Sequence, residues 1–437
     1  MDSDRLQRLR SRAIFGASVG TFVEFFDYAS YSFLSTTIAS VFFPVSGVTI
    51  ALVQTWALFA LSFFMRPVGA LVWGHYGDHI GRTKILAITI FGIGIATCAI
   101  GSLPGYRSIG LAAPLLLVLF RLFQSFCTAG EYTGAAVMVG EFAPRSLRGR
   151  YISAVPISCA LGFLAAAGLA SVLRGLLTDD EMLSWGWRVP FFAGGVLTVS
   201  GWYVRQKLPE TPEFTTLLSE RGVTNAPVRW VLRRHGFLLL RLLCVMGVNA
   251  AGYYLVLGYA ATYLQVELGF RAVEATWITT LGLLVYLPLV YSFAVLSDRI
   301  SRRSILLASS LLFIALSYPA FKVLTTGGFY TALLTQFALV AILSLNDATF
   351  ATYFVESFPA AIRFSGFALA FNVGVAVFGG SAPLVATWLI QTTRNKLMPA
   401  WMMTAVAVLS VPALLRPINE SPAEVSERAN SALPSCR

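Results

Sequence analysis

Carboxylate side chains stand inside long apolar stretches of this sequence, where charges are rare. Glu24 and Asp27 are three residues apart in one such stretch, so a helix would place them on the same face. Two carboxylates held close together in a medium of low dielectric repel each other, and one of them then takes up a proton more easily. We interpret these two, and Glu131 in a later stretch, as candidates for carrying a proton. The alternative is that they pair with basic or polar groups and lock helices together.

Arginine side chains in the apolar stretches could bind an acidic group. Arg121 offers two parallel hydrogen bonds to a carboxylate, and we interpret it as a substrate-binding residue. Glu131 lies ten residues further along, about 15 Å on a helix, so the two could occupy different depths of one cavity. The alternative for Arg121 is an ion pair with Glu24 or Asp27. Arg66 lies nearer the end of its stretch, where its charge could reach water.

Polar side chains in the second half of the sequence could complete such a site. Asp347 lies inside an apolar stretch, where a carboxylate favours a cationic or amine-bearing substrate. Further hydrogen-bonding groups come from Asn249, Tyr253, Tyr254 and Asn372. The tyrosine rings could hold a quaternary ammonium. Each feature also has a simpler explanation, because polar groups can bond a neighbouring helix and most aromatic residues in such stretches serve packing.

Sequence patterns of common enzymes and metal sites are missing. The histidines, His75, His79 and His235, form no metal-binding cluster, and neither a GxSxG nor a phosphate-binding loop pattern occurs. The cysteines stand singly, so neither a disulfide framework nor a metal site is indicated. We therefore predict no enzyme, no metal and no cofactor.

The composition indicates what must position these side chains. Of the 437 residues 57% are hydrophobic and only 12% are charged, and the mean hydropathy is +0.72. Soluble domains have about 25% charged residues, so much of this surface must face lipid. The apolar stretches are long enough to span a bilayer as helices and lack the alternation of barrel strands. The predicted spans are residues 13–43, 50–76, 84–104, 109–141, 151–173, 187–205, 237–266, 275–296, 304–322, 328–356, 365–391 and 398–415.

The longest polar stretch divides these twelve helices into two groups of six. We predict an N-terminal bundle (1–205), a cytoplasmic linker (206–236), a C-terminal bundle (237–415) and a cytoplasmic tail (416–437). In the linker, the prolines of Pro209–Phe214 favour a turn and a helix start. Arginine and lysine concentrate on the side of the termini and the linker, which the positive-inside rule places in the cytoplasm of a cell (inner) membrane. This distribution accounts for the net charge of +11 without nucleic acid as a partner.

Two motifs occur once in each half. Gly74–Lys84 after the second span and Leu296–Arg303 after the eighth each place an acid at a helix end, then a tight turn, then bases that open the next helix. In the same register, Glu141–Pro144 matches Glu356–Pro359, each followed by an arginine. Both matches together favour duplication of a six-helix unit, an architecture of transporters with the substrate site between the halves.

The first of these motifs carries a family resemblance. Gly74–Lys84 resembles the G-x-x-x-D-R-x-G-R-R/K signature of the major facilitator superfamily, although Tyr76 and His79 depart from its common Leu and Arg. Nearly the whole chain is similar to the metabolite:proton symporter branch, and most of all to proline/glycine-betaine transporters. The segments that carry this similarity are Val23–Tyr28, Arg66–Gly69, Gly130–Ala135, Trp185–Phe192, Glu210–Phe214 and Phe371–Val373.

The resemblance implies an all-α membrane protein of two pseudo-symmetric six-helix bundles. It adds Tyr28 and Tyr132, within two of the matching segments, to the candidate substrate-binding residues. It also implies that charged residues at the cytoplasmic edge stabilise the outward-facing state, beyond simply anchoring the topology. These candidate gating residues are Asp78, Arg82, Glu141, Arg148, Asp298 and Arg302. Osmoregulatory members can carry a long C-terminal coiled coil, but the tail has no heptad repeat and does not support osmotic sensing.

We therefore predict a proton-coupled importer of a small zwitterion, such as proline or betaine, that works as a monomer in the bilayer. Arg121 would hold the carboxylate, Asp347 the amine end, and Glu24, Asp27 or Glu131 the proton. A di- or tricarboxylate–proton symporter remains an alternative, as do an exporter of a toxin or siderophore and a non-transporting receptor.

Overall fold

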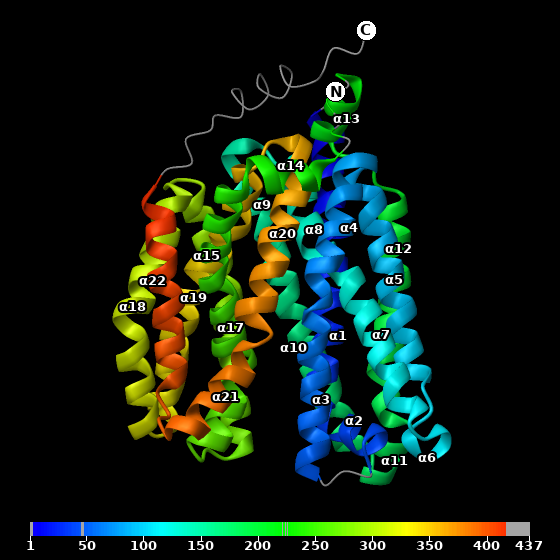
Figure 1. Ribbon diagram of the computed structural model, residues 1–437, viewed down its shortest axis with the longest axis vertical. Helices are drawn as coiled ribbons and strands as arrows, with labels where there is room; N and C mark the ends of the chain where they lie inside the picture. The colour runs from blue at the N-terminus through cyan, green and yellow to red at the C-terminus, as the bar shows by residue number, and fades with distance from the viewer. Residues whose placement is uncertain (1–2, 45–47, 221, 223, 225, 417–437) are drawn as a thin grey trace.

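The structure, a computed structural model, describes residues 3–44, 48–220, 222, 224 and 226–416. All regular secondary structure in this part of the chain is helical (Figure 1). The tail proposed for 416–437 lies outside the described residues, apart from Arg416.

Six passes make up the first half. They are α1 (Ser3–Phe33) with α2 (Ser35–Phe42), α3 (Val48–Phe63) with α4 (Met65–Ile80), α5 (Arg82–Ser102), α7 (Ala112–Thr128) with α8 (Glu131–Phe142), α9 (Arg148–Ile152) with α10 (Ala154–Leu176), and α12 (Val189–Gln206). The connections contain α6 (Tyr106–Ile109), α11 (Asp179–Ser184) and the 3-10 turns η1 (Arg145–Leu147) and η2 (Gly186–Arg188).

Six further passes make up the second half. They are α15 (Gly236–Gly252) with η3 (Tyr253–Gly258), α16 (Ala260–Thr262) and η4 (Tyr263–Glu267); α17 (Ala272–Ser297); α18 (Arg302–Thr326); α19 (Phe329–Ser357); α20 (Arg363–Gly374) with η6 (Val375–Gly379) and α21 (Ala382–Thr393); and α22 (Met398–Leu415). The 3-10 turn η5 (Ala360–Ile362) precedes α20. The helices η3, η4 and η6 are π-helical. This form is rare in proteins overall but is often found at functional sites.

Three of the described passes fall short of the length or hydropathy of a typical membrane span. Nine helices in the described residues are long and apolar enough to cross a membrane by length and composition alone. The remaining passes are α1, which carries Glu24 and Asp27, α3 with α4, whose helices have 16 residues each, and α12, which carries Arg205 in its last turn. The α1 helix also has 31 residues, about 46 Å, and so exceeds the hydrocarbon thickness of about 30 Å.

The linker between the halves contains α13 (Pro212–Ser219) and α14 (Pro227–Arg234). Thr211 caps α13 by accepting a hydrogen bond from the backbone amide of Phe214, and Pro212 occupies the first turn, where a missing N–H is tolerated. The predicted helix start in this segment is therefore confirmed.

The two halves converge at one end of the molecule. We call the end that carries α13 and α14 the linker end, and the opposite end, which carries α2, α6 and α11, the far end (Figure 1). At the linker end α4 packs against α20, and α9 packs against α17 and α19. At the far end the ribbons of α3 and α21 stand apart (Figure 1). The described contacts between the halves thus concentrate toward the linker end.

Glycines let the helices of the first half approach closely. A Cβ atom on Gly162 of α10 would lie 2.4 Å from the carbonyl oxygen of Phe22 in α1, and one on Gly69 of α4 would lie 2.3 Å from that of Phe126 in α7. Membrane helices pack through such van der Waals contacts, because lipid gives no hydrophobic drive for helix association. The helices that carry Glu24 and Arg66 are therefore held tightly in their bundle.

Candidate functional site

A small pocket lies between the two halves, and we call it the central pocket. Its first-half wall comes from α1, α4, α8 and α10, and its second-half wall from α15, η3, α19, α20 and η6. Its polar groups come from Arg66, Tyr132, Asn249, Tyr253, Tyr254 and Asp347, and its rings also from Phe25, Phe350 and Phe371. The pocket volume is about 30 Å³, room for about one water molecule, so a metabolite can bind only if the walls move apart.

An ion pair on the first-half wall joins α1 to α4. Arg66 Nη2 lies 2.9 Å from Glu24 Oε1 and also donates a hydrogen bond of 2.8 Å to the Tyr28 hydroxyl. The guanidinium lies over the rings of Tyr28 and Phe63, each at 5.1 Å. Arg66 is thus held by one carboxylate oxygen, one hydroxyl and two ring faces, and its Nε donor has no partner among the described residues.

Several buried polar atoms around the central pocket have no hydrogen-bond partner among the described residues. They are Glu24 Oε2, Arg66 Nε, and the hydroxyls of Tyr132 and Tyr253. A buried donor or acceptor without a partner costs about 1–3 kcal/mol, so such groups are uncommon in a packed interior. Other atoms of this kind lie elsewhere in the described residues, but a polar ligand or ordered water in the central pocket would supply partners for these four.

The second-half wall carries a carboxylate that only neutral groups hold. Asp347 Oδ1 accepts a hydrogen bond of 2.9 Å from Asn249 Nδ2, and Oδ2 accepts one from the hydroxyl of Tyr286 on α17. Asp347 is 4% exposed, and among the described residues no basic side chain pairs with it. Burying a carboxylate without a cation is unfavourable, so this position favours either a proton or a cationic ligand.

Aromatic rings close the central pocket on both sides. Toward the linker end, Tyr132 stacks on Phe371 with a centroid distance of 4.6 Å, and Phe350 lies nearly parallel to both rings. Toward the far end, Phe63 packs edge-on against Tyr254, with centroids 5.5 Å apart. Each contact joins the two halves, so either ring contact must separate before the pocket opens on that side.

A second pair in the first half, Asp27 with Arg121, lies outside the central pocket. Arg121 Nη1 is 3.2 Å from Asp27 Oδ2 and 2.7 Å from Gln124 Oε1. Gln124 and Thr97 complete the ring of hydrogen bonds, because Thr97 donates to Asp27 Oδ1 at 3.2 Å and accepts from Gln124 at 2.7 Å. The guanidinium also lies 4.1 Å from the ring centre of Tyr31. This is the pairing that the sequence offered as the alternative role of Arg121.

A third pair, Glu131 with Arg205, is enclosed on all sides. Arg205 holds both oxygens of Glu131, one of them at 2.8 Å, and it also donates to the carbonyl oxygens of Gly16 and Leu86. Neither side chain is exposed to solvent. Gly20 of α1 covers the pair, and a Cβ atom there would lie 1.9 Å from a Glu131 oxygen. Glu131 therefore lies away from the pocket, in a contact that joins α8, α12 and α1.

The remaining predicted binding residues are divided between the pocket and its surroundings. Asn249, Tyr132 and Tyr253 line the central pocket. Tyr28 accepts a hydrogen bond from Arg66 through its hydroxyl. Asn372 instead bridges the halves, because its amide donates 2.8 Å to the carbonyl oxygen of Ala129 in the loop before α8.

Two important partners were missing from the sequence analysis. Tyr286 stands among many aromatic residues of its span, and nothing in the pattern marks it as the residue that holds Asp347. Arg205 is the last residue of the sixth predicted span, and nothing in the pattern marks it as the partner of Glu131. The need of the buried Glu131 for a cation could have identified Arg205, since membrane-embedded acids are usually paired.

The predicted gating residues form one network at the linker end. Asp78 accepts hydrogen bonds of 3.1 and 2.7 Å from the backbone amides of Phe364 and Ser365, in the first turn of α20. Arg82 lies 3.3 Å from Asp78 and 3.4 Å from Glu141. These contacts hold the end of α4 against the start of a helix in the other half, where a carboxylate is favoured by the helix dipole.

The second half repeats the same arrangement in the opposite direction. Asp298 at the end of α17 accepts hydrogen bonds of 2.7 and 2.9 Å from the amides of Gly149 and Arg150 in α9. Arg302 lies 3.2 Å from Asp298 and 2.7 Å from Glu356. Each half thus uses the acid of its repeated motif to cap a helix of the other half, which gives the duplicated sequence motif a shared physical role.

The linker helix α13 joins this network through Glu213. One oxygen of Glu213 is 2.6 Å from Arg148 in the first half, and the other contacts Arg363 in the second half. Partial burial alone would raise the pKa of Glu213, but the charges of Arg363 and Arg148 outweigh it and hold the pKa below its usual value. Arg363 also lies 2.9 Å from Glu141. At neutral pH the ionised Glu213 therefore bridges an arginine from each half.

Comparison with known proteins agrees with this architecture. Residues 13–226 match the family described as Sugar (and other) transporter, and residues 242–436 match the Major Facilitator Superfamily. A proline/betaine transporter of Salmonella typhimurium is 32% identical over 92% of this chain and 82% of its own length. A putative proline/betaine transporter of Staphylococcus aureus is 34% identical over 91% of this chain and 86% of its own.

Solved structures show the same fold at lower sequence identity. The proton:xylose symporter XylE bound to 6-bromo-6-deoxy-D-glucose superimposes with a TM-score of 0.79 at 16% identity, over 95% of this chain and 97% of that chain. FucP in the outward conformation superimposes with a TM-score of 0.66 at 14% identity, over 92% and 97%. The predicted fold of two six-helix bundles is confirmed. The chain therefore belongs to the major facilitator superfamily, as a relative of the proline/betaine transporters.

Proposed function

We propose that the protein is a proton-coupled symporter of a small zwitterionic metabolite of the proline or betaine kind. The observation that carries the proposal is the charge arrangement of the central pocket. Arg66 and Glu24 pair on one wall, and Asp347 lies on the other wall, where its hydrogen-bond donors among the described residues are neutral. The names of the curated relatives support the same substrate class.

Competition between Glu24 and the substrate carboxylate for Arg66 would couple proton transport to substrate transport. In the structure Glu24 occupies one nitrogen of the guanidinium, and only one of its own oxygens takes part. A proton on Glu24 removes its negative charge, and Arg66 then becomes available to a substrate carboxylate, which it can bind with two parallel hydrogen bonds. Substrate and proton therefore favour each other's binding, which is the thermodynamic requirement for symport.

The opposite wall would hold the cationic end of the substrate. A cation beside Asp347 gains a charge partner that the protein itself does not supply. The rings of Tyr132, Phe350 and Phe371 add faces that attract a quaternary or protonated amine. The role first predicted for Arg121 passes to Arg66 in this proposal, since Arg121 is bound to Asp27 away from the pocket.

Alternating access would open one aromatic contact at a time. With the linker end closed by the capping contacts of Asp78 and Asp298, the pocket would fill from the far end after Phe63 leaves Tyr254. The π-helical segments η3 and η6 border the pocket, and they are the elements we expect to bend. Rupture of the linker-end network would then release both cargoes on that side.

The topology is part of the proposal. Arg82, Arg148, Arg302 and Arg363 gather at the linker end together with both ends of the described chain (Figure 1). The positive-inside rule then places the linker end, both termini and the linker in the cytoplasm of the cell inner membrane. The bounds of 1–205, 206–236 and 237–415 for the halves and linker, and a monomeric functional unit, complete the proposal.

A di- or tricarboxylate symporter fits the pocket less well. Its substrate would bring two or three negative charges next to Asp347, while the one arginine that lines the pocket already pairs with Glu24. Like charges in a medium of low dielectric repel strongly. The same liposome experiment tests this alternative when succinate or citrate replaces the zwitterion.

Uptake into liposomes tests the proposal. The purified full-length protein is reconstituted, a pH gradient (inside alkaline) is imposed, and entry of radiolabelled proline and glycine betaine is measured. We expect the gradient to accelerate uptake, and we expect Glu24→Gln to retain exchange of internal for external substrate while losing the response to the gradient. Glu274→Gln, a partly exposed carboxylate of the far end that pairs with Arg271 outside the central pocket, serves as the control. Uptake of both zwitterions that ignores the gradient would exclude proton coupling.

A further inference from the structure

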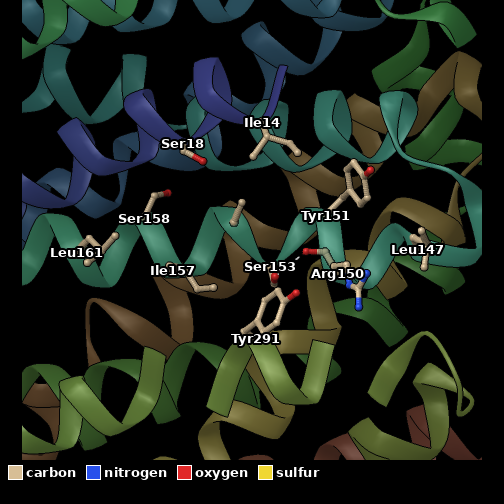
Figure 2. A pocket seen from close by; sticks show the side chains of 11 residues that line it. Ile14, Ser18, Leu147, Arg150, Tyr151, Ser153, Ile157, Ser158, Leu161 and Tyr291 are labelled. Carbon is tan, nitrogen blue, oxygen red and sulfur yellow. Dashed lines mark hydrogen bonds between the residues drawn. The ribbon is translucent and has the colours of Figure 1, made fainter. Parts of the chain in front are cut away.

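A groove outside the central pocket lies between the two halves near the linker end. It is formed by α1, by α9 with α10, and by α17, which contributes Tyr291 (Figure 2). Its volume is about 490 Å³, far more than that of the central pocket. Because its walls belong to both halves, the groove exists in this form only while the linker end is closed.

The charged side chain that lines the groove lies toward one end, beside Leu147, and the lining of the other end carries no charged side chain (Figure 2). Arg150 and Tyr291 lie toward the linker end, and Ile157 and Leu161 continue along α10 toward the middle of the membrane (Figure 2). From Arg150 to Leu161 the chain advances eleven residues, about 16 Å along a helix and thus about half of the hydrocarbon thickness. Leu161 is 43% exposed and Tyr291 46% exposed, so both ends are accessible from the side.

Arg150 and Tyr291 offer donors that the described part of the protein does not use, whereas the serines of the groove are already bonded. The Ser153 and Ser158 hydroxyls donate to backbone carbonyl oxygens of their own helix, each at 2.7 Å. Among the described residues, no hydrogen bond or ion pair engages the Arg150 guanidinium or the Tyr291 hydroxyl. Arg150 takes part in the linker-end network only through its backbone amide, which donates to Asp298 at 2.9 Å. None of the residues that line the groove is acidic.

We propose that this groove binds an anionic phospholipid, with the phosphate at Arg150 and Tyr291 and an acyl chain along Ile157 and Leu161. A zwitterionic headgroup would bring a cation to a lining that has a cation of its own and no carboxylate. An anionic headgroup instead supplies the missing charge, as in the basic pockets between membrane helices that bind such lipids. The lipid bridges α10 and α17, so it stabilises the state that is closed at the linker end.

Lipid retention by the purified protein tests the proposal. The full-length chain is purified in detergent, equilibrated with equal amounts of dioleoylphosphatidylglycerol and dioleoylphosphatidylcholine, and analysed by native mass spectrometry. We expect preferential retention of phosphatidylglycerol. Arg150→Gln, which removes an exposed side chain that has no partner among the described residues and so preserves the fold, lowers this preference about fivefold. Leu161→Trp fills the apolar end while leaving Arg150 in place, and it lowers retention of both lipids.

The matched control is Arg145→Gln, which removes an exposed arginine of the same end that does not line the groove. We expect this variant to retain phosphatidylglycerol like the unaltered protein. An equal loss in Arg145→Gln and Arg150→Gln would mean general attraction to the basic surface, and the groove would not be the site. Equal retention of the two lipids by the unaltered protein would also overturn the proposal.

Discussion

The two halves of the molecule hold their buried carboxylates differently. On the first-half side Glu24, Asp27 and Glu131 each pair with an arginine of a neighbouring helix. On the second-half side Asp347 is held by an amide and a phenol, without a cation. A carboxylate that is paired with an arginine of the protein can hold helices together or accept a proton. A carboxylate without such a partner is available to a cationic ligand. The difference supports the proposal that the proton binds beside Arg66 and that the cationic end of the substrate binds beside Asp347.

The three pairs of the first half also differ among themselves. Glu131 has both oxygens bound by Arg205, and neither side chain is exposed. Glu24 binds Arg66 through one oxygen, and the other oxygen has no partner among the described residues although it is buried. A fully satisfied pair gains little from protonation or from a ligand, while a half-satisfied pair gains from both. This contrast favours Glu24 over Glu131 as the proton carrier.

The largest expected effect is on folding, from breaking the enclosed pair. Arg205→Met leaves Glu131 as an unpaired charge in the interior, which we expect to lower the free energy of unfolding by about 3–5 kcal/mol. The double variant Arg205→Met with Glu131→Met replaces both charges by apolar groups of similar size and should recover most of that stability. Thermal unfolding of the purified variants in detergent measures both changes.

Transport by the double variant carries the functional part of this prediction. We expect it to keep its response to a pH gradient, since the pair lies outside the central pocket. If the double variant folds well but has lost proton coupling, Glu131 carries the proton. The preference for Glu24 over Glu131 would then be wrong.

The same double replacement in the central pocket should separate folding from function. Arg66→Met with Glu24→Met also removes both members of a buried pair, so we expect near-normal thermal stability. Substrate affinity should fall by about 10- to 100-fold, because the charge-assisted hydrogen bonds to the substrate carboxylate are lost. Isothermal titration of the purified protein with proline or glycine betaine measures the affinity. Unchanged affinity in this variant would show that the carboxylate binds elsewhere.

On the second-half wall, Asp347→Asn keeps a side chain that can bond Asn249 and Tyr286 but removes the negative charge. We expect the dissociation constant of a zwitterion to rise about tenfold, with the response to a pH gradient retained. The comparison ligand is a carboxylate of similar size without an amine, such as cyclopentanecarboxylate, whose affinity should not fall. Loss of the gradient response in Asp347→Asn would instead make this residue a proton carrier.

The sequence was sufficient to predict the fold and to identify the buried acids, but not to identify the residues that pair with them. Apolar stretches, the loop charges and the repeated motifs predicted two six-helix bundles, because these features depend on local composition and periodicity. Which arginine meets which acid depends on helix rotation and packing. Without the helix arrangement, the sequence could not decide whether Arg121 binds the substrate or pairs with Asp27. It also did not identify Arg205 and Tyr286 as the partners of Glu131 and Asp347. The acids were found because charge is rare in these stretches; their partners were not, because tyrosines and terminal arginines are common there.

The smallest expected effect distinguishes two tyrosines of the second-half wall. The Tyr253 hydroxyl has no hydrogen-bond partner among the described residues, whereas the Tyr286 hydroxyl donates to Asp347. Tyr253→Phe removes an unsatisfied polar group, so thermal stability should stay unchanged or rise slightly, while substrate affinity falls about fivefold if the hydroxyl bonds the substrate. Tyr286→Phe should instead lower stability and affinity together, because it leaves Asp347 with one donor. Stability and affinity that change in parallel in both variants would show that Tyr253 belongs to the packing of the wall, and that the unpartnered groups around the pocket do not mark a ligand.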